Sequence, residues 1–284
     1  MPALSVPDMI AAIRDIVDDE SGNTHSDAEM VTYINSAVSY YDAFLAEFAE
    51  TALMQFRDIT HDGSELQDVM PYLPRIVSIE RTSDDPRTET IPLPRGFADR
   101  FPFISKSAGT IPGYYYVQNN QLAIVPFQSS PGVDRVWVVL RSPELHYGTT
   151  TAASSTTSLV LDSTPTAGNI QKVNDAYNMI PVMITTAAIR EINVINDYTG
   201  STYTCTLQRT FENNPASSTY SLLPVIDPEF HWLFVWHPVI LCRMRTQEST
   251  IEAVSERTRL ESLLLQRIRS NQKQRARYFT RHGF

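Results

Sequence analysis

Apolar residues at helical spacing predict a short first helix. They recur three and four positions apart between Met9 and Val17, which places them on one face of a helix. The helix should end in the acidic run Asp18-Asp19-Glu20. Because carboxylates at a helix C-terminus oppose the helix dipole, we expect this end either to fray or to meet a partner.

A second helix should begin at the sequence SDAE, residues 26–29. Ser26 and Glu29 have the spacing of a capping box, in which the Ser26 hydroxyl accepts from the Glu29 amide and the Glu29 carboxylate accepts from the Ser26 amide. The apolar stripe continues at helical spacing to Ala52 and predicts a helix of about 30 residues.

Prolines change the pattern between Pro71 and Leu140 and exclude long helices there. Short strands are predicted instead, with a hairpin turn at Asn119-Asn120 because asparagine tolerates a positive φ angle. The predicted strands are 75–80, 113–118, 121–125 and 133–140.

A polar stretch rich in serine and threonine, 146–158, is typical of a linker or an insertion point. A β-rich block then extends from Leu159 to about Leu222. Within it, residues 191–207 alternate between apolar and polar on both sides of the break 198–201. This alternation predicts a half-buried hairpin.

Helical spacing returns after the β-rich block. The pair Asp227-Pro228 predicts a helix start, and this helix should run toward Met244 with a kink at Pro238. A last long helix is predicted from about 250 to 278.

Together these elements predict an α+β fold. We expect a helical body with long helices at both ends of the chain, a small β-strand region and an inserted antiparallel β module. The predicted body is 1–148 with 223–278, the module is 149–222, and 279–284 is a C-terminal tail.

Charge is distributed unevenly along the chain, whose net charge is -9. Arg14 alone opposes the many acidic residues of 1–50, whereas Glu261 alone opposes the arginines and one lysine of 257–281. A basic helix of this kind can bind nucleic acid or an acidic protein surface.

Cys205 and Cys242 are too few for a disulfide framework, so we expect two buried thiols. The start of the chain has neither the basic nor the apolar segment of a secretory signal. The most apolar stretch, 232–242, is shorter than the roughly 20 residues that span a bilayer. We therefore expect a soluble, non-secreted protein that has no membrane partner.

Catalytic patterns are missing from the sequence. His231 and His237 do not have the i, i+4 spacing that puts two ligands on one helix face, and no HExxH, GxSxG, GxGxxG or Walker loop occurs. Core or interface histidines are the favoured interpretation. We expect no enzyme activity, no catalytic residue, no cofactor and no metal site.

The order of the elements carries more information than any single residue. A helix ending in aspartates is followed by SDAEMVTYINSAVSYY, by IPLPRGF, by GYYYVQNNQLAIVPFQSSPGVDRVWVVLRSPEL and by a helical hairpin. This succession resembles the head-to-tail adaptor, or connector, proteins of tailed bacteriophages. The resemblance covers roughly residues 5–145 and 223–278.

The β-rich block has a pattern of its own, at Tyr177, Asn178, Met179, Tyr198, Gly200, Pro215, Thr219 and Tyr220. These positions are similar to those of a β-rich module found in many phage virion proteins. The chain departs from that pattern because Asn178 and Met179 have no glycine between them and Ile180-Pro181 follows directly.

The resemblance implies a structural virion protein that is assembled in the host cytoplasm. Adaptors of this family form a ring, usually of twelve copies, beneath the portal at the neck of the virion. The ring extends the channel through which genomic DNA passes without specific binding, and it docks a tail or nozzle protein. Anchoring on the portal is then expected from Arg269, Arg275, Arg277, Tyr278 and Phe279.

Acidic side chains that face such a channel would repel phosphate and keep the duplex sliding. The candidates are Asp15, Asp18, Asp19 and Glu20. We expect the β module on the outside of the ring. Two alternatives stay open: a tail or baseplate component, and a DNA-binding packaging factor that uses the basic C-terminal helix.

Overall fold

The computed structural model divides the chain into two compact units. One comprises Met1–Leu53 and Arg141–Phe284, and the other is Met54–Leu140. The side chains of the last helix are described as far as Ser270. The described residues are 2–19, 22, 24–48, 54–60, 67–68, 75–81, 88–92, 114–118, 121–125, 133–139, 142–186 and 189–281.

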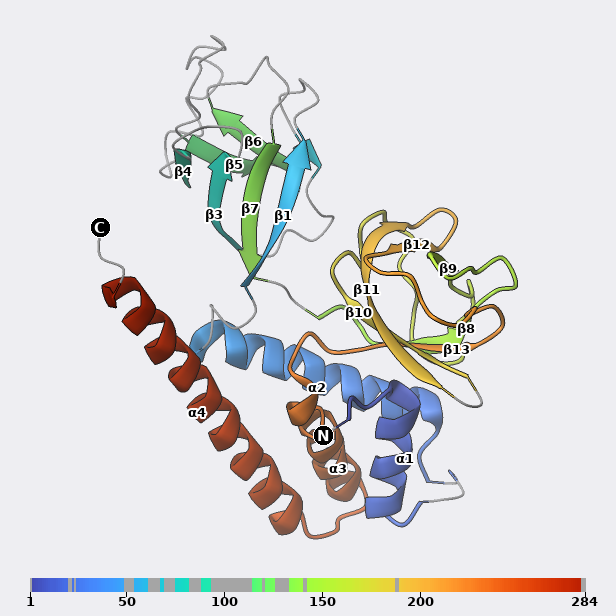
Figure 1. Cartoon of the computed structure of the whole chain (residues 1–284). Coiled ribbons are helices and arrows are strands. Elements are labelled where there is room, and N and C mark those ends of the chain that lie inside the picture. The colour runs from blue at the N-terminus through green and yellow to red at the C-terminus, as the bar shows by residue number, and fades with distance from the viewer. Residues whose placement is uncertain are drawn as a thin grey trace. The chain divides into compact units, whose positions relative to one another are not determined.

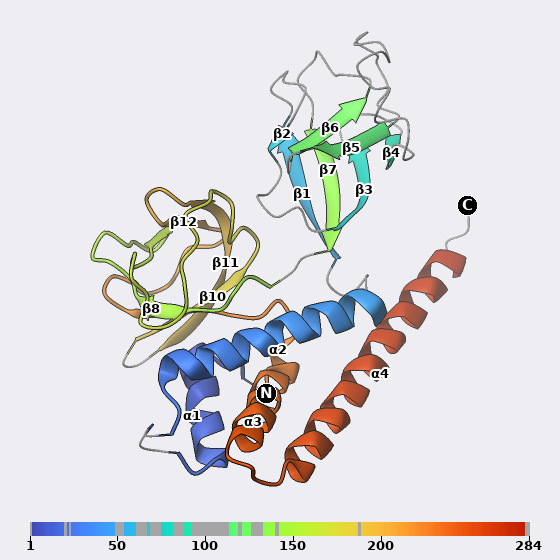
Figure 2. The same ribbon diagram turned by 180° about the vertical axis from the view of Figure 1, so that it is seen from behind.

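The α-helices described in the first unit are grouped around α3 (Leu233–Arg245) (Figures 1 and 2). The helices around it are α1 (Val6–Ile16), α2 (Asp27–Phe48) and α4 (Ile251–Arg281). Helix α3 contacts each of the other three. Because a helix that is apolar on nearly all sides is stable only when it is enclosed, the most apolar stretch of the sequence forms the centre of this group.

Both helix starts near the N-terminus differ from the predicted pattern. Ser5, which was not predicted as a cap, makes the complete capping box with Asp8. Ser26 Oγ accepts from the Glu29 amide at 3.3 Å, but the Glu29 carboxylate binds Tyr33 and Arg245 instead of the Ser26 amide. The predicted reciprocal bond is therefore wrong, because α3 supplies a cationic partner for Glu29.

One further predicted helix start is wrong, and one predicted helix end is untested. Helix α2 is described as far as Phe48, and its predicted continuation to Ala52 lies outside the described residues. The pair Asp227-Pro228 starts a 3₁₀ turn, Pro228–Phe230, with no side-chain cap, and α3 begins only at Leu233. By contrast, the last helix begins at Ile251, close to the predicted start.

The first unit also contains a curled antiparallel sheet, which precedes α3 in the chain. Its order is β8-β13-β10-β11-β12-β9. A bridge between Thr150 and Leu161 and a hydrogen bond from the Thr151 amide to the Val160 carbonyl (2.9 Å) join the two outer strands. The sheet therefore closes on itself. The strands are β8 (Tyr147–Thr149), β9 (Ser158–Val160), β10 (Pro181–Thr185), β11 (Arg190–Thr199), β12 (Thr204–Leu207) and β13 (Thr219–Leu222).

The predicted hairpin at 191–207 is confirmed, because β11 and β12 pair antiparallel around Thr199 and Thr204. The polar stretch 146–158 is not a plain linker, however. It contains β8, and His146 at its start is fully buried. Cross-strand pairing of β8 with β13 makes this polar segment part of the sheet, which no periodicity in the segment itself indicates.

The curled sheet is fastened to the helices by polar contacts. Asn35 on α2 donates to the Leu145 carbonyl and accepts from the Leu145 amide, at 3.1 and 2.7 Å. The Val6 amide at the start of α1 donates to Ser221 Oγ at 2.8 Å. Ala3 packs with Met183 and Leu223. Sheet and helices thus belong to one compact unit, and the predicted division into a body and a module 149–222 stays a prediction.

The second unit contains a seven-stranded sheet of order β1-β7-β3-β4-β5-β6-β2. All neighbours are antiparallel except β4 and β5. The four predicted strands are confirmed, whereas β1, β2 and β4 were not predicted. The bounds are β1 (Met54–Thr60), β2 (Gln67–Asp68), β3 (Arg75–Arg81), β4 (Thr88–Pro92), β5 (Tyr114–Gln118), β6 (Gln121–Val125) and β7 (Val133–Val139).

The fold is therefore mixed α+β, as predicted. Gln118 pairs with Gln121 across β5 and β6, and the predicted turn residues Asn119-Asn120 lie outside the described residues. None of the helices searched in the described part of the chain is long and apolar enough to cross a membrane.

Candidate interaction surfaces

The described residues contain no group of three or more His, Cys, Asp or Glu side chains that could bind a metal ion. Both thiols are buried, and burial raises the pKa of Cys242 to about 11. His231 accepts from the Leu4 amide at 3.1 Å, which ties the N-terminal segment to the start of α3. The features that remain are surfaces and the polar contacts that shape them.

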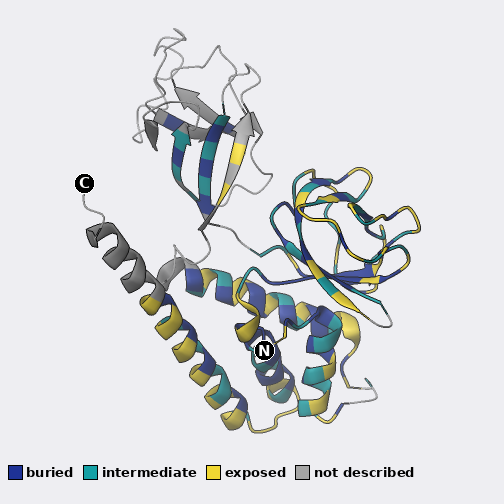
Figure 3. Ribbon diagram, in the orientation of Figure 1, coloured by how far each residue is buried: buried dark blue, intermediate teal, exposed yellow. Residues whose placement is uncertain are grey.

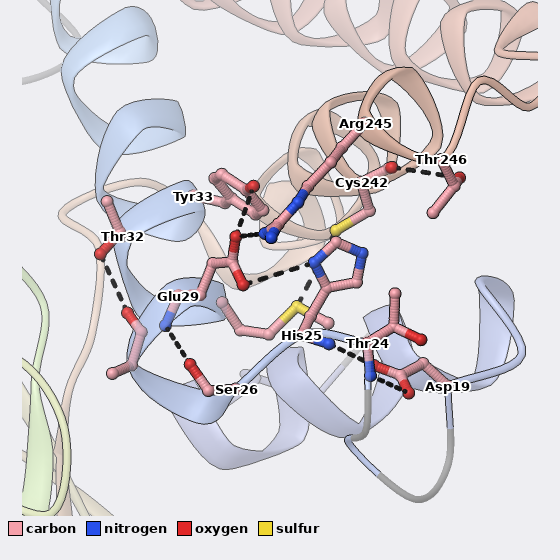
Figure 4. A network of polar contacts seen from close by, with 12 residues as sticks. Asp19, Thr24, His25, Ser26, Glu29, Thr32, Tyr33, Cys242, Arg245 and Thr246 are labelled. Atoms are coloured by element: carbon pink, nitrogen blue, oxygen red, sulfur yellow. Dashed lines mark hydrogen bonds and ion pairs between the residues drawn. The ribbon is translucent and has the colours of Figure 1, made fainter.

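One polar network joins the α1–α2 turn to the end of α3 (Figure 4). The Asp19 carboxylate accepts from the Thr24 and His25 amides at 3.1 and 2.9 Å. The Glu29 carboxylate accepts from Tyr33 Oη at 2.9 Å and forms an ion pair with Arg245. The Asp19 carboxylate therefore fixes the turn between α1 and α2, and Glu29 links the start of α2 to the end of α3.

Ionisation in this network follows from burial and nearby charge. Burial of Asp19 raises its pKa, but the two backbone amides and Arg14 outweigh that effect, so the pKa lies below its usual value. Burial and the neighbouring Arg245 lower the pKa of His25, whose side chain is almost fully enclosed. At neutral pH the turn therefore holds an ionised aspartate beside a neutral histidine.

The four acidic candidates have different environments. Asp15 and Asp18 are exposed on and just after α1, with no ion-pair partner among the described residues. Asp19 is only 5% exposed, because its carboxylate caps the turn. Glu20 lies outside the described residues. The sequence did not indicate that one of two adjacent aspartates would turn inward.

Helix α4 has one packed face and one exposed face. Its packed face consists of Ala253, Leu260, Leu264 and Ile268, spaced at helical intervals. Figure 3 shows exposed residues along much of the remainder of its described length. Three large apolar side chains lie on the exposed part: Ile251, Val254 and Leu263.

A polar and aromatic cluster anchors α4 on α2 and α3. Tyr41 Oη donates to the Glu261 carboxylate at 3.0 Å across 220 positions of sequence. The Arg257 guanidinium lies 5.7 Å from the centre of the Tyr40 ring, which is within range of a cation–π contact. Burial, together with Arg257, lowers the pKa of His237 to about 4, so this cluster contains a neutral imidazole at pH 7.

The five predicted portal-binding residues all lie on α4. Arg269 is exposed, and no ion pair holds it among the described residues. Arg275, Arg277, Tyr278 and Phe279 belong to the last turns of the helix, beyond the part whose side chains are described.

The curled sheet encloses a histidine among tyrosines. His146 Nε2 and Nδ1 lie 3.1 and 3.2 Å from the hydroxyl oxygens of Tyr177 and Tyr220. Tyr198 Oη donates to the Gln171 carbonyl at 2.6 Å. Burial lowers the pKa of His146 to about 4, so the ring is neutral at pH 7 with one donor and one acceptor nitrogen.

Several positions on which the predicted resemblance of the β-rich block rests lie in this core. Tyr177, Asn178, Tyr198 and Tyr220 are buried. A Cβ atom on Gly200 would lie 2.3 Å from backbone atoms of Lys172. These matches therefore identify packing positions of the sheet, not a site that faces solvent.

The second unit has an exposed aromatic and charged cluster of its own. Phe56 lies opposite Trp137, and their ring centres are 5.2 Å apart. Arg135 donates two hydrogen bonds to Asp58, at 2.8 and 2.9 Å, and stacks 4.0 Å from the Phe56 ring centre. This cluster was not predicted, because it requires the unpredicted strand β1 beside β7.

No protein-family model matches the chain, and no curated protein matches it at a significant level.

Proposed function

We propose that the chain is a structural protein of a tailed-bacteriophage virion, a head-to-tail adaptor that forms a ring below the portal. In this proposal the helices form the subunit body, with the long helices α2 and α4 toward the two ends of the chain, and the ring extends the DNA channel and docks the tail. The order of elements along the sequence carries the proposal.

Helix α4 is the element to which we assign portal binding. It is 31 residues long, and the packed residues among those whose side chains are described lie between Ala253 and Ile268. Arg269 at this boundary is exposed and unpaired in the described range. Arginine binds carboxylates in a bidentate geometry, which suits an acidic partner surface.

The decisive test of portal binding removes the end of α4. A chain truncated after Asn271 should fold normally, because it keeps every residue of α4 that is described as buried, and should no longer co-sediment with the portal protein of the same phage. A full-length variant, Arg275→Gln with Arg277→Gln, should weaken the same binding. Lys172→Gln with Arg209→Gln loses the same charge on the curled sheet and serves as the control. Unchanged co-sedimentation of the truncated chain would refute the assignment.

Imaging tests the ring itself. Negative-stain images of the full chain mixed with portal should contain a coaxial ring, whose copy number we expect to be twelve. In the virion neck we expect the curled sheet on the outer side of that ring. A tail or baseplate component, the first alternative, would bind a tail partner and leave the portal bare.

The exposed arginines of α4 also favour a second candidate, a DNA-binding packaging factor. Such a factor would bind duplex DNA as a free chain, and its affinity would fall steeply as salt rises, because phosphate neutralisation releases counterions. An adaptor should show no specific DNA binding. A gel-shift titration at two salt concentrations distinguishes the two.

A further inference from the structure

Helices α1 and α4 lie on opposite sides of α3 (Figures 1 and 2). Helix α3 contacts both of them, which makes it the centre of the group. The exposed faces of α1 and α4 therefore lie on different sides of the helix group. Two such faces can meet when they belong to two different copies of the chain.

The exposed face of α4 contains a ridge of arginine, leucine and arginine. Arg259, Leu263 and Arg267 follow at four-residue intervals, so their side chains lie in one row. All three are exposed: the two arginine side chains by 57% and 60%, and Leu263 by 43%. An apolar side chain between two guanidinium groups suits a contact with an acidic surface that has a small apolar centre.

The ion pairs within the chain leave hydrogen-bond donors free on Arg259 and Arg267. Arg259 pairs with Glu256 of its own helix at 2.8 Å, and Arg267 approaches Glu229 at 3.8 Å. Exposed ion pairs of this kind contribute little to stability. Both guanidinium groups therefore keep donors for a further carboxylate.

The exposed face of α1 is complementary. Ala11 and Asp15 lie four residues apart on α1 and so share one side of the helix, and Asp18 follows just after its C-terminal end; all three are exposed. The one basic residue of the helix, Arg14, is occupied, because it donates to Asp27 at 2.6 Å and to the His25 carbonyl at 3.1 Å. Asp15 and Asp18 are thus acidic groups at a helix C-terminus, where they oppose the dipole, and neither forms an ion pair with a described residue.

The charges of α1 and those of α4 as far as Ser270 are not paired with each other within one chain. Among the described ion pairs, none joins an acidic residue of α1 to an arginine of α4. We infer that the Arg259–Leu263–Arg267 ridge of one copy binds the Ala11–Asp15–Asp18 face of the next copy. Such a contact joins two different surfaces of identical chains, so it repeats and can close a ring. The inference rests on the proposed ring and names its subunit contact.

A cysteine cross-link tests the contact directly. Cys205 and Cys242 are buried, so thiols introduced on the surface are the reactive ones. In a mixture of D15C and L263C chains, copper-phenanthroline oxidation should yield a disulfide-linked dimer that neither chain gives alone. The double variant D15C/L263C should give a ladder of linked multimers. A mixture of Glu212→Cys and Leu263→Cys chains is the control and should give no dimer.

Charge reversal tests the energetics of the same contact. Asp15→Lys with Asp18→Lys should raise the protein concentration needed for ring assembly by about tenfold or more, and added Arg259→Glu and Arg267→Glu in the same chain should largely restore it. Glu144→Lys with Glu212→Lys changes the net charge equally at exposed positions elsewhere and should have little effect.

The outcomes separate this inference from the proposed function. Rings with portal but no cross-link, or assembly insensitive to charge reversal, overturn the contact and leave the adaptor function standing. A cross-link without any portal-bound ring supports the contact and overturns the adaptor function. Absence of the cross-link both in the concentrated free protein and on portal overturns the contact in every case.

Discussion

Arg190 on β11 donates two hydrogen bonds to the Asp8 carboxylate on α1, at 2.9 and 2.8 Å, across 182 positions of sequence. Asp8 also accepts from the amide and hydroxyl of Ser5, so one carboxylate caps α1 and fastens it to the curled sheet. The two substitutions at this contact should therefore have unequal effects. Arg190→Ala removes a half-exposed ion pair and should cost less than about 1 kcal/mol. Asp8→Ala also removes the capping interaction and should cost about 1 to 2 kcal/mol.

Urea denaturation of both variants measures this difference. Lys172→Ala, which removes an exposed cation from the loop between β9 and β10, is the control for Arg190→Ala. Equal losses for Asp8→Ala and Arg190→Ala would contradict the double role of Asp8.

Acid should weaken the same contact. Burial pushes the pKa of Asp8 up, but hydrogen bonds from Ser5 and the interaction with Arg190 outweigh it, so the folded pKa lies below the model-peptide value of 3.8. The stabilising effect is therefore complete above the unfolded pKa and is lost as pH falls through the folded pKa. Unfolding midpoints measured below pH 4 should fall less steeply in Asp8→Asn than in the wild type. A parallel decline in both proteins would exclude Asp8 as a contributor.

His146 should make stability depend on pH in a different range. Its folded pKa of about 4 lies below the usual 6.5, because burial disfavours the charged ring. The unfolded chain then binds a proton that the folded chain does not, so stability is complete above about pH 6.5 and declines as pH falls toward 4, by about 1.4 kcal/mol per unit.

Thermal unfolding between pH 4 and 7 tests the role of His146. His146→Gln should be less stable at pH 7, because the hydroxyls of Tyr177 and Tyr220 lose their hydrogen bonds to the imidazole, and its pH dependence should be shallower. Tyr177→Phe disturbs the same cluster without removing the titrating ring and should keep the wild-type slope. A His146→Gln slope equal to the wild-type slope would assign the pH dependence to the other histidines.

Gly200 should tolerate no side chain. An alanine Cβ there would lie 2.3 Å from the Lys172 carbonyl carbon and oxygen, and backbone atoms cannot rotate away as a side chain can. Gly200→Ala should lower the free energy of unfolding by about 1 to 3 kcal/mol, the usual cost of overpacking. Denaturant unfolding beside Ser201→Ala, an exposed neighbour, measures it. A Gly200→Ala variant as stable as Ser201→Ala would disprove the close approach.

The contact between Tyr41 and Glu261 should govern how firmly α4 is held. Tyr41→Phe removes the donor to a partly buried carboxylate and should cost about 1 kcal/mol or somewhat more. Hydrogen exchange in α4 should accelerate. Tyr40→Phe is a matched control, because Tyr40 is 40% exposed and its contacts are made by the ring. Similar exchange rates in the two variants would argue against a role for the hydroxyl.

Local pattern was sufficient for the elements whose stability is mostly local or repetitive. Periodicity located α1 and α4, the strands β3, β5, β6 and β7, and the β11–β12 hairpin, because apolar spacing directly reflects which face of an element is buried. The uneven charge of the two chain ends was also visible in the sequence.

Tertiary structure decided what depends on partners far along the chain. Strand β1 exists because it pairs with β7, and the segment around His146 belongs to a core because β8 pairs with β13. The Glu29 carboxylate pairs with Arg245 and does not cap the start of its own helix. Asp19 is buried, whereas the adjacent Asp18 is exposed. A residue's own neighbours in sequence determine its local preference, but pairing and charge compensation depend on groups that only folding brings within a few ångströms.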